Sequence, residues 1–283
     1  MVTNNGTPPV PENDRQDNLA RLCREIQDMH RSLSSPADSP RNKLCRRLAD
    51  RMPLAHATGA DNFAKICQSG ALLSLTRLDA IAPLDWSRHP VETQLETRDC
   101  VFLFAGPFRY PATSCGFLFR PDLAEARKAD GAASPFDSGG LVNHHRPPGG
   151  EPPLDFLRRH EMPIPQYRQY HLLVLDVLFD DPWHYVDGVN LIRQGPVQLA
   201  PAQSDARRWT FEVRLRDELP LRSHLQAVFS PLFASESDSV PETLYRYRTE
   251  GVDIIEYPGL RGSDEFNFEL MKRKCEAYIR SIL

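Results

Sequence analysis

Apolar residues along this chain follow two periods, one typical of strands and one typical of helices. Alternating or continuous apolar runs predict β-strands over residues 52–56, 101–104, 115–119, 171–179, 209–215 and 251–257. Apolar residues three and four positions apart predict helices over residues 15–33, 41–51, 62–69 and 265–283. Together these elements predict an α+β fold.

The stretch from Ala55 to Ser74 carries the first candidate chemistry. It is expected to form a strand, a turn and an amphipathic helix, with Thr58 or Asp61 as the helix cap and Gly70 as the left-handed residue after its end. His56 and Thr58 are two residues apart, so they share one face at the end of the strand. Groups at strand ends are held rigidly without being fully buried, and such positions often carry binding sites.

A carboxylate stands in the strand predicted over residues 209–215. Strict alternation directs Phe211, Val213 and Leu215 to one face and Glu212 and Arg214 to the other. Two interpretations are open at this point. Glu212 is a functional carboxylate, or it lies on the exposed face of an edge strand, paired with a neighbouring arginine.

Composition limits the classes of protein and of site. The chain has 283 residues, a formal net charge of −4, and no apolar run long enough to cross a membrane. Its first 13 residues are polar and do not resemble a signal peptide, and its six cysteines stand singly, so we expect a cytoplasmic protein with reduced thiols. His144, His145 and His160 do not have metal-ligand spacing, so no metal site is predicted.

The first 51 residues are predicted to be an attached segment, with a polar, disordered start followed by two helices, and residues 52–283 to be the main domain. The helix over 41–51 carries arginines and a lysine on its polar face. A solvated surface is the favoured interpretation of this basic face, and a contact for nucleic-acid phosphates is the alternative.

Three motifs in this order resemble ADP-ribosyltransferases of the diphtheria-toxin/poly-ADP-ribose-polymerase class, and most closely the DarT type, which modifies DNA bases. The first motif runs from His56 to Ser74, as His-x-Thr, Asn62 and Ile-x-x-x-Gly-x-Leu-x-Ser. The second is the strand ending in Phe104, followed by Arg109 and Pro111. The third is the strand that carries Glu212.

The resemblance implies a split, mostly antiparallel β-sandwich with flanking helices and NAD as co-substrate without a metal. It implies that His56 binds the adenine-side ribose, that the Ala57 backbone binds the nicotinamide amide, and that Phe104 stacks on nicotinamide. Glu212 would serve the transition state. Further site residues under the resemblance are Thr58, Asn62, Arg109 and a catalytic arginine, which is Arg88 by spacing, with Arg77 and Arg98 as alternatives.

The resemblance also implies a nucleic-acid acceptor, either a DNA or an RNA base, and a role as a toxin or antiphage effector with an antitoxin or immunity partner. A protein acceptor is the second choice, because the acidic balance of the chain does not favour a large nucleic-acid footprint. A non-catalytic module that binds NAD or ADP-ribose is the alternative from another functional class. The segment Tyr245–Arg248 offers aromatic and basic side chains for a nucleic-acid strand, or is a solvated strand.

Overall fold

The computed structural model describes residues 40–143, 147, 150–179, 181–187, 210–236 and 239–283. The helix predicted over residues 15–33 and the polar residues before it lie outside this part of the chain. No helix of the described part is both long and apolar enough to span a bilayer.

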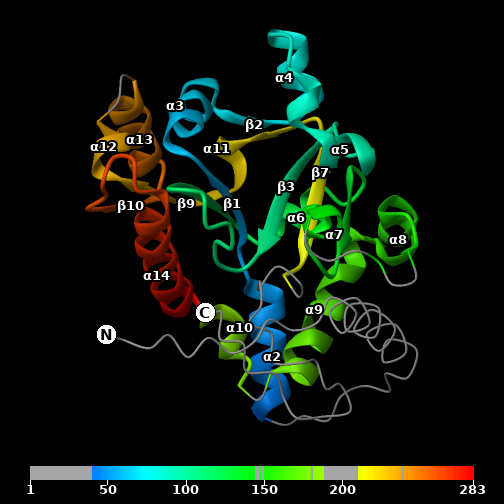
Figure 1. Cartoon of the computed structure of the whole chain (residues 1–283). Helices are drawn as coiled ribbons and strands as arrows, with labels where there is room; N and C mark the ends of the chain where they lie inside the picture. Colours follow the sequence, from blue (N-terminus) through cyan, green and yellow to red (C-terminus); the bar gives the residue numbers. More distant parts are fainter. Residues whose placement is uncertain (1–39, 144–146, 148–149, 180, 188–209, 237–238) are drawn as a thin grey trace, which may run out of the picture.

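Eight strands form one hydrogen-bonded sheet in the order β10-β9-β4-β1-β3-β7-β5-β6, and β2 and β8 form a separate pair (Figure 1). Among the strands that the structure describes, only β9 and β10 pair in parallel. The strands are β1 (Leu54–Thr58), β2 (Ala71–Leu73), β3 (Cys100–Ala105), β4 (Cys115–Phe119), β5 (Gly131–Ser134), β6 (Met162–Pro163), β7 (Glu212–Arg216), β8 (Glu218–Pro220), β9 (Leu225–Pro231) and β10 (Asp253–Tyr257). The α+β class and the mostly antiparallel pairing are confirmed, whereas the predicted sandwich is not, because these eight strands belong to a single sheet.

The sheet is split between β1 and β3. These strands pair only at Leu54 with Ala105 and at Ala55 with Phe104, whereas β1 pairs with β4 along its full length from residue 54 to 58. Beyond Ala55, β1 remains with β4 and β3 remains with β7. The facing edges of β1 and β3 are therefore not joined by a continuous ladder of hydrogen bonds.

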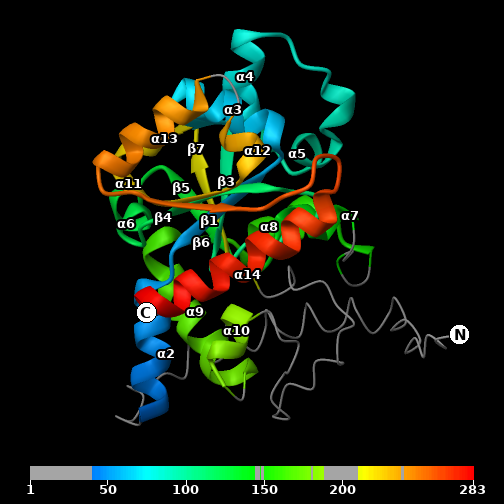
Figure 2. The same ribbon diagram turned by 90° about the vertical axis from the view of Figure 1, so that its left-hand side faces the viewer.

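Helices cover the sheet from several sides. They are α2 (Pro40–Arg51), α3 (Ala60–Ser69), α4 (Leu75–Ile81), the short 3₁₀ helix η1 (Trp86–Arg88), α5 (Pro90–Gln94), α6 (Asp122–Ala126), α7 (Ser138–Asn143), α8 (Pro153–His160), α9 (Ile164–Leu178), α10 (Trp183–Asp187), α11 (Leu221–His224), α12 (Leu232–Ser235), α13 (Val240–Thr249) and α14 (Asp264–Ile282). Helices α12, α13 and α14 lie beside the β9–β10 end of the sheet (Figures 1 and 2), and the start of α7 meets β7 through a hydrogen bond from Ser138 to Glu212. Between sheet and helices lies a continuous apolar core, in which Phe63 of α3 stacks on Phe117 of β4 at 5.4 Å between ring centroids.

The turn and helix that follow β1 agree with the sequence pattern except at the cap. Gly70 ends α3 with φ +69°, a left-handed conformation that glycine adopts without a Cβ clash. The predicted capping by Thr58 or Asp61 is wrong: Gly59 occupies the N-cap and no side chain caps the helix. Thr58 is still the last residue of β1, and its carbonyl accepts a hydrogen bond from the Ser114 N–H.

The strand predicted over residues 171–179 is instead part of α9. A continuous apolar run does not by itself distinguish a buried strand from a buried helix. Here Tyr167, His171 and Val174 recur at helical spacing on the buried face of α9. Pro165 in the first turn of α9 is a helix-start signal, and it lies six residues before the region assigned as a strand.

The segment around Tyr245 is helical as well. It belongs to α13, where Tyr245 is 69% exposed and Tyr247 is 2% exposed. Residues two apart on a helix do not share a face. The two tyrosines therefore do not form the joint stacking surface that was predicted for a nucleic-acid strand. The alternative prediction, a solvated β-strand, is also wrong, because the segment is helical.

Helix α2 is joined to the end of α9 by Arg41. Its guanidinium donates to Asp176 Oδ1 at 2.9 Å and to the Asp176 carbonyl at 2.7 Å, and it also reaches the Phe179 carbonyl. The last carbonyls of a helix have no partner within the helix, and the helix dipole favours a cation there. One residue of the predicted basic face is thus engaged in holding the fold together.

We expect Arg41→Ala to lower the free energy of unfolding by about 1–2 kcal/mol, because it leaves the α9 carbonyls without their charged donor. Urea denaturation measures this change. Arg47→Ala is the matched control, since Arg47 is exposed on the same helix. Equal effects of the two substitutions would contradict a specific role for Arg41.

Candidate functional site

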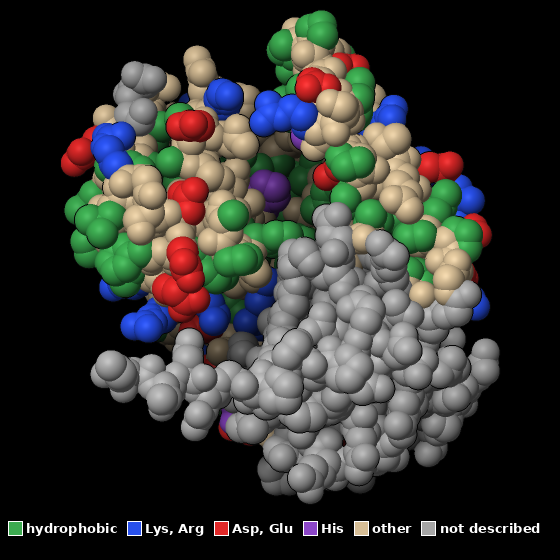
Figure 3. Space-filling model, in the orientation of Figure 1, with side chains coloured by type: hydrophobic (Ala, Val, Ile, Leu, Met, Phe, Trp, Pro, Cys, Tyr) green, Lys and Arg blue, Asp and Glu red, His purple; other side chains and the backbone are tan. Residues whose placement is uncertain are grey.

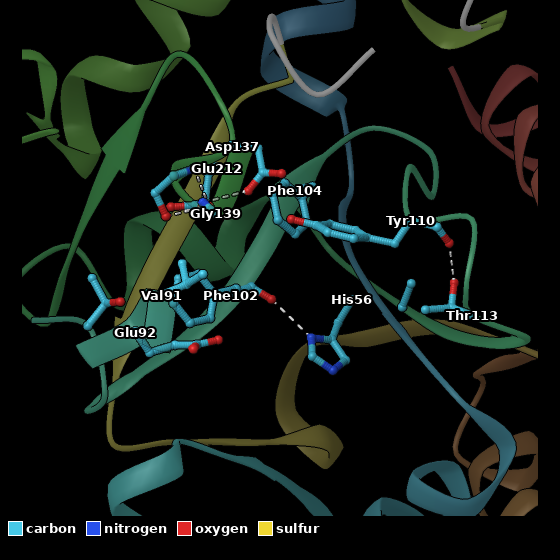
Figure 4. Close-up of a pocket in the computed structure, with 13 residues that line it drawn as sticks. His56, Val91, Glu92, Phe102, Phe104, Tyr110, Thr113, Asp137, Gly139 and Glu212 are labelled. Carbon is cyan, nitrogen blue, oxygen red and sulfur yellow. Dashed lines mark hydrogen bonds between the residues drawn. The ribbon is translucent and has the colours of Figure 1, made fainter. Parts of the chain in front are cut away.

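A cavity of about 310 Å³ opens where β1 and β3 diverge, and we call it the split cavity. It is lined by His56, Ala57, Val91, Glu92, Thr97, Phe102, Phe104, Tyr110, Thr113, Asp137, Ser138, Gly139 and Glu212. Figure 3 shows a hollow on this face of the molecule with a histidine side chain exposed in it, and Figure 4 shows the lining residues. Four of the predicted site residues meet here: His56, Ala57, Phe104 and Glu212.

Glu212 lies in the middle of the sheet. Its strand β7 runs between β3 and β5, with Phe104 directly opposite on one side and Ser134 on the other. Its side chain is buried. The interpretation of Glu212 as the exposed face of an edge strand is therefore wrong.

The two oxygens of Glu212 have different partners. Oε2 accepts hydrogen bonds from the Ser138 N–H and from the Ser138 hydroxyl, each at 3.0 Å. Oε1 lies 3.3 Å from Arg214 Nε, which is ion-pair distance, but it makes no hydrogen bond within the described structure. One oxygen is thus fixed by the start of α7, and the other retains its capacity to accept from a ligand.

Burial raises the pKa of Glu212 above its ordinary value. Arg214 opposes this shift, the nearby Asp137 carboxylate adds to it, and the hydrogen bonds from Ser138 favour the ionised form. The result is a carboxyl group that takes up a proton more readily than an exposed glutamate. A perturbed carboxyl group that lines a cavity is a candidate for a functional site.

His56 is held by the strand from which β1 diverges. Its Nδ1 lies 3.0 Å from the Phe102 carbonyl (Figure 4). Because a carbonyl oxygen only accepts, Nδ1 carries the proton in this contact. Burial lowers the pKa of His56, so the ring is neutral at pH 7 and its Nε2 is an acceptor.

The peptide groups of Ala57 face the split. Backbone groups of successive residues in a strand point to opposite neighbours. The Thr58 carbonyl accepts from Ser114 on the β4 side, and the Pro53 carbonyl accepts from Gly106 on the β3 side. Ala57 lies four residues after Pro53, so its backbone groups point to the same side as those of Pro53. The N–H and C=O of Ala57 are therefore directed toward the place where the β1–β3 ladder has ended.

An aromatic pair closes one side of the cavity. The rings of Phe104 and Tyr110 lie 5.0 Å apart between centroids and are tilted by 55°. Such rings present a flat, polarisable surface to a planar ligand. Tyr110 stands between Arg109 and Pro111 of the second motif but was not predicted from the sequence as a site residue.

The remaining predicted residues lie elsewhere. Asn62 and Arg88 line a second hollow of about 1380 Å³ at the start of α3, together with Lys65 and Arg261. Thr113 lines the split cavity and the next residue, Ser114, lines this second hollow.

Thr58 and Arg109 are not among the described lining residues of either hollow. Thr58 is 7% exposed, so it supports the loop from within the core. The Arg109 side chain is also buried, and it donates to the Tyr185 carbonyl.

The two alternative arginines are committed to other contacts. Arg77 forms an ion pair with Glu218 at 3.3 Å. Arg98 lies over the Trp86 ring at 4.3 Å and donates to the Thr93 hydroxyl at 2.8 Å. Of the three candidate arginines, Arg88 is the one that lines either hollow.

The segment Asp137–Gly139 is the part of the cavity that sequence reasoning missed. Its serine, glycine and proline neighbours over residues 134–141 predict a turn-rich loop. In the structure Ser138 begins α7 and its main-chain and side-chain donors both face Glu212. A serine followed by two glycines is a signal for a helix start with free N–H groups, but nothing local indicates which acceptor they meet.

No cluster of three or more histidine, cysteine, aspartate or glutamate side chains with the arrangement of a metal site occurs in the described ranges. His144 and His145 lie outside those ranges. His160 is buried and its ring packs against Phe156 at 4.5 Å between centroids.

Glu212→Gln should stabilise the protein at alkaline pH by about 1–3 kcal/mol. An acid with a raised pKa in the folded state opposes folding when it is ionised, and glutamine keeps the shape without the charge. The gain should diminish as the pH falls through the raised pKa, because wild-type Glu212 then becomes neutral. Urea unfolding between pH 5 and pH 9 measures it, with exposed Glu242→Gln as the control. A stability difference that does not depend on pH would refute the raised pKa.

No family model matches the sequence, and no curated protein matches it either. Among solved structures, the chain is similar to DarT from Thermus sp. 2.9 in complex with NAD+, with 11% identity and a TM-score of 0.38 over 73% of this chain and 95% of that chain. It is also similar to the same protein in complex with ADP-ribosylated ssDNA, with 12% identity and a TM-score of 0.39 over 73% and 94% of the two chains.

Proposed function

We propose that this protein is an NAD-dependent mono-ADP-ribosyltransferase whose reaction takes place in the split cavity. The observation that carries the proposal is the meeting of His56, Phe104 and Glu212 in one cavity, although they stand on three different strands and about 50 or more residues apart in the chain. The sequence motifs, which do not depend on the fold, assign the same three residues to one site.

The nicotinamide end of NAD would lie between Ala57 and the aromatic pair. Nicotinamide carries a carboxamide that both donates and accepts hydrogen bonds, and the Ala57 peptide groups offer the complementary acceptor and donor. In NAD the ring is a flat cation, and an aromatic face attracts such a cation. Phe104 and Tyr110 supply that face.

Glu212 would act on the ribose next to the nicotinamide. When the bond between ribose C1′ and the nicotinamide nitrogen breaks, its electron pair leaves with nicotinamide and positive charge builds on the ribose. A fixed carboxylate stabilises this oxocarbenium-like charge, and its free oxygen Oε1 can accept a hydrogen bond from a ribose hydroxyl. The acceptor then bonds to C1′ and releases a proton, which the carboxylate is placed to take.

His56 would bind a hydroxyl of the adenine-side ribose through Nε2. A neutral imidazole fixed by its Nδ1 proton presents a single acceptor in a defined direction. Arg88 would bind phosphate or acceptor at the second hollow, where Lys65 and Arg261 add positive charge and Asp61 and Asp264 add negative charge.

A nucleic-acid base is the acceptor we propose, on the basis of the sequence motifs. A protein acceptor is the second choice. A non-catalytic NAD or ADP-ribose binder differs from both in that it would release no nicotinamide.

The test of the proposed function is incubation of the wild type with labelled NAD and, separately, single-stranded DNA, RNA and cell lysate. We expect label on a nucleic acid, and we expect Glu212→Gln to lower the transfer rate by about 10³-fold or more, because it removes the charge that acts in the transition state. Binding of NAD to the variant, measured by calorimetry, should stay within about threefold of wild type. Absence of both label and nicotinamide release with every acceptor would favour the binding module.

A matched pair of variants tests the role of His56. His56→Asn keeps a donor at the Nδ1 position and loses the acceptor at Nε2, so we expect the Kd for NAD to rise about tenfold. His56→Gln places an amide at the distal position, and its Kd should lie nearer to that of wild type. Equal Kd values for the two variants would argue against a hydrogen bond at Nε2.

A further inference from the structure

Arg214 is a buried cation beside the candidate carboxylate, and the three motifs assign it no role. It stands two residues after Glu212 on β7, so both side chains point to the same face of the sheet. Its side chain is only 4% exposed. Phe102 of β3 and Ala132 of β5 are its partners on the two neighbouring strands, and neither carries a charge.

The guanidinium of Arg214 bridges two carboxylates. Nε lies 3.3 Å from Glu212 Oε1, and Nη2 donates to Glu161 Oε2 at 3.0 Å. Glu161 follows α8 and is partly exposed, with 39% of its side chain accessible. The planar fork of arginine suits such a bridge, because its donors point in fixed directions.

The contact between Arg214 and Glu212 acts through charge. Because the Nε–Oε1 pair is not aligned as a hydrogen bond, Oε1 retains an unmet acceptor capacity while it experiences the positive charge at close range. Few other groups balance the charge of Glu212. Ser138 donates from α7 and the Asp137 carboxylate opposes ionisation, while Glu92 of α5 and His56 of β1 face the same cavity.

We infer that Arg214 is a positioning residue for the transfer reaction, anchored by Glu161, that favours the ionised form of Glu212 and holds its carboxylate in place. This inference rests on the proposed function, in which ionised Glu212 stabilises the ribose cation. Arg214 itself touches no part of NAD in this account. It acts through Glu212 alone, so its removal should leave the affinity for NAD almost unchanged.

The experiment is the pH profile of nicotinamide release from NAD for wild type, Arg214→Gln and Arg214→Lys. Without the positive charge, Glu212 takes up a proton at higher pH, so the acidic limb of kcat should move up by about one to three pH units in Arg214→Gln. Arg214→Lys keeps the charge, and its limb should lie closer to that of wild type. KM for NAD should change less than about threefold in both variants.

Arg216→Gln is the matched control, because Arg216 stands on the same strand with 71% of its side chain exposed and pairs only loosely with Asp99 at 3.9 Å. The acidic limb of the kcat–pH profile of Arg216→Gln should coincide with that of wild type. A uniform loss of rate in Arg214→Gln at every pH, with an unmoved limb, would overturn the inference and leave Arg214 a structural role.

Infrared difference spectra of the Glu212 carboxyl group, identified by its absence in Glu212→Gln, separate this inference from the proposed function. The protonated-carboxyl band should persist to higher pH in Arg214→Gln than in wild type, whether or not NAD turns over. If NAD is not consumed by wild type, the proposed function fails. If the band titrates at the same pH with and without Arg214, the inference fails.

Discussion

The divergence of β1 from β3 after two paired residues is the constraint on which the site depends. In a continuous ladder the Ala57 peptide groups would bond to β3, and no space would exist between the strands. Because the ladder ends, the Phe102 carbonyl needs another partner, and His56 supplies it. The same hydrogen bond therefore satisfies the freed backbone and orients the imidazole in the cavity.

A carboxylate in the centre of a sheet carries an electrostatic penalty that the surrounding structure only partly offsets. Two donors from Ser138 and the charge of Arg214 favour the ionised form of Glu212, while burial and Asp137 oppose it. Buried charges are costly unless they are paired, so a purely structural strand would carry an apolar residue at this position. A site that needs a charge at the point of reaction accepts such a loss of stability.

The sequence was informative where a local pattern determines a local structure. The strand–turn–helix around His56, the left-handed Gly70 and the strand that carries Glu212 all followed from periodicity and glycine chemistry. The local pattern predicted a strand in place of α9, because an apolar run is equally typical of a buried strand and of a buried helix. The local sequence pattern also could not show that Ser138 meets Glu212. The two residues are far apart in the sequence, and the pairing of β5 with β7 brings them together. Arg109 illustrates the same limit, because its place in the motif did not reveal that its side chain is turned into the core.

The order of strands in the sheet has a consequence for the newly made chain. The strands β1, β3 and β7 lie side by side although β7 begins at residue 212, so the cavity closes only after the chain has been synthesised beyond β7. Contacts between residues so far apart in sequence form late, because the intervening loop must be closed first. A chain that is still being translated, or one that is cut short before β7, therefore lacks Glu212 and with it one wall of the split cavity. Any reaction at this site must wait for the complete sheet.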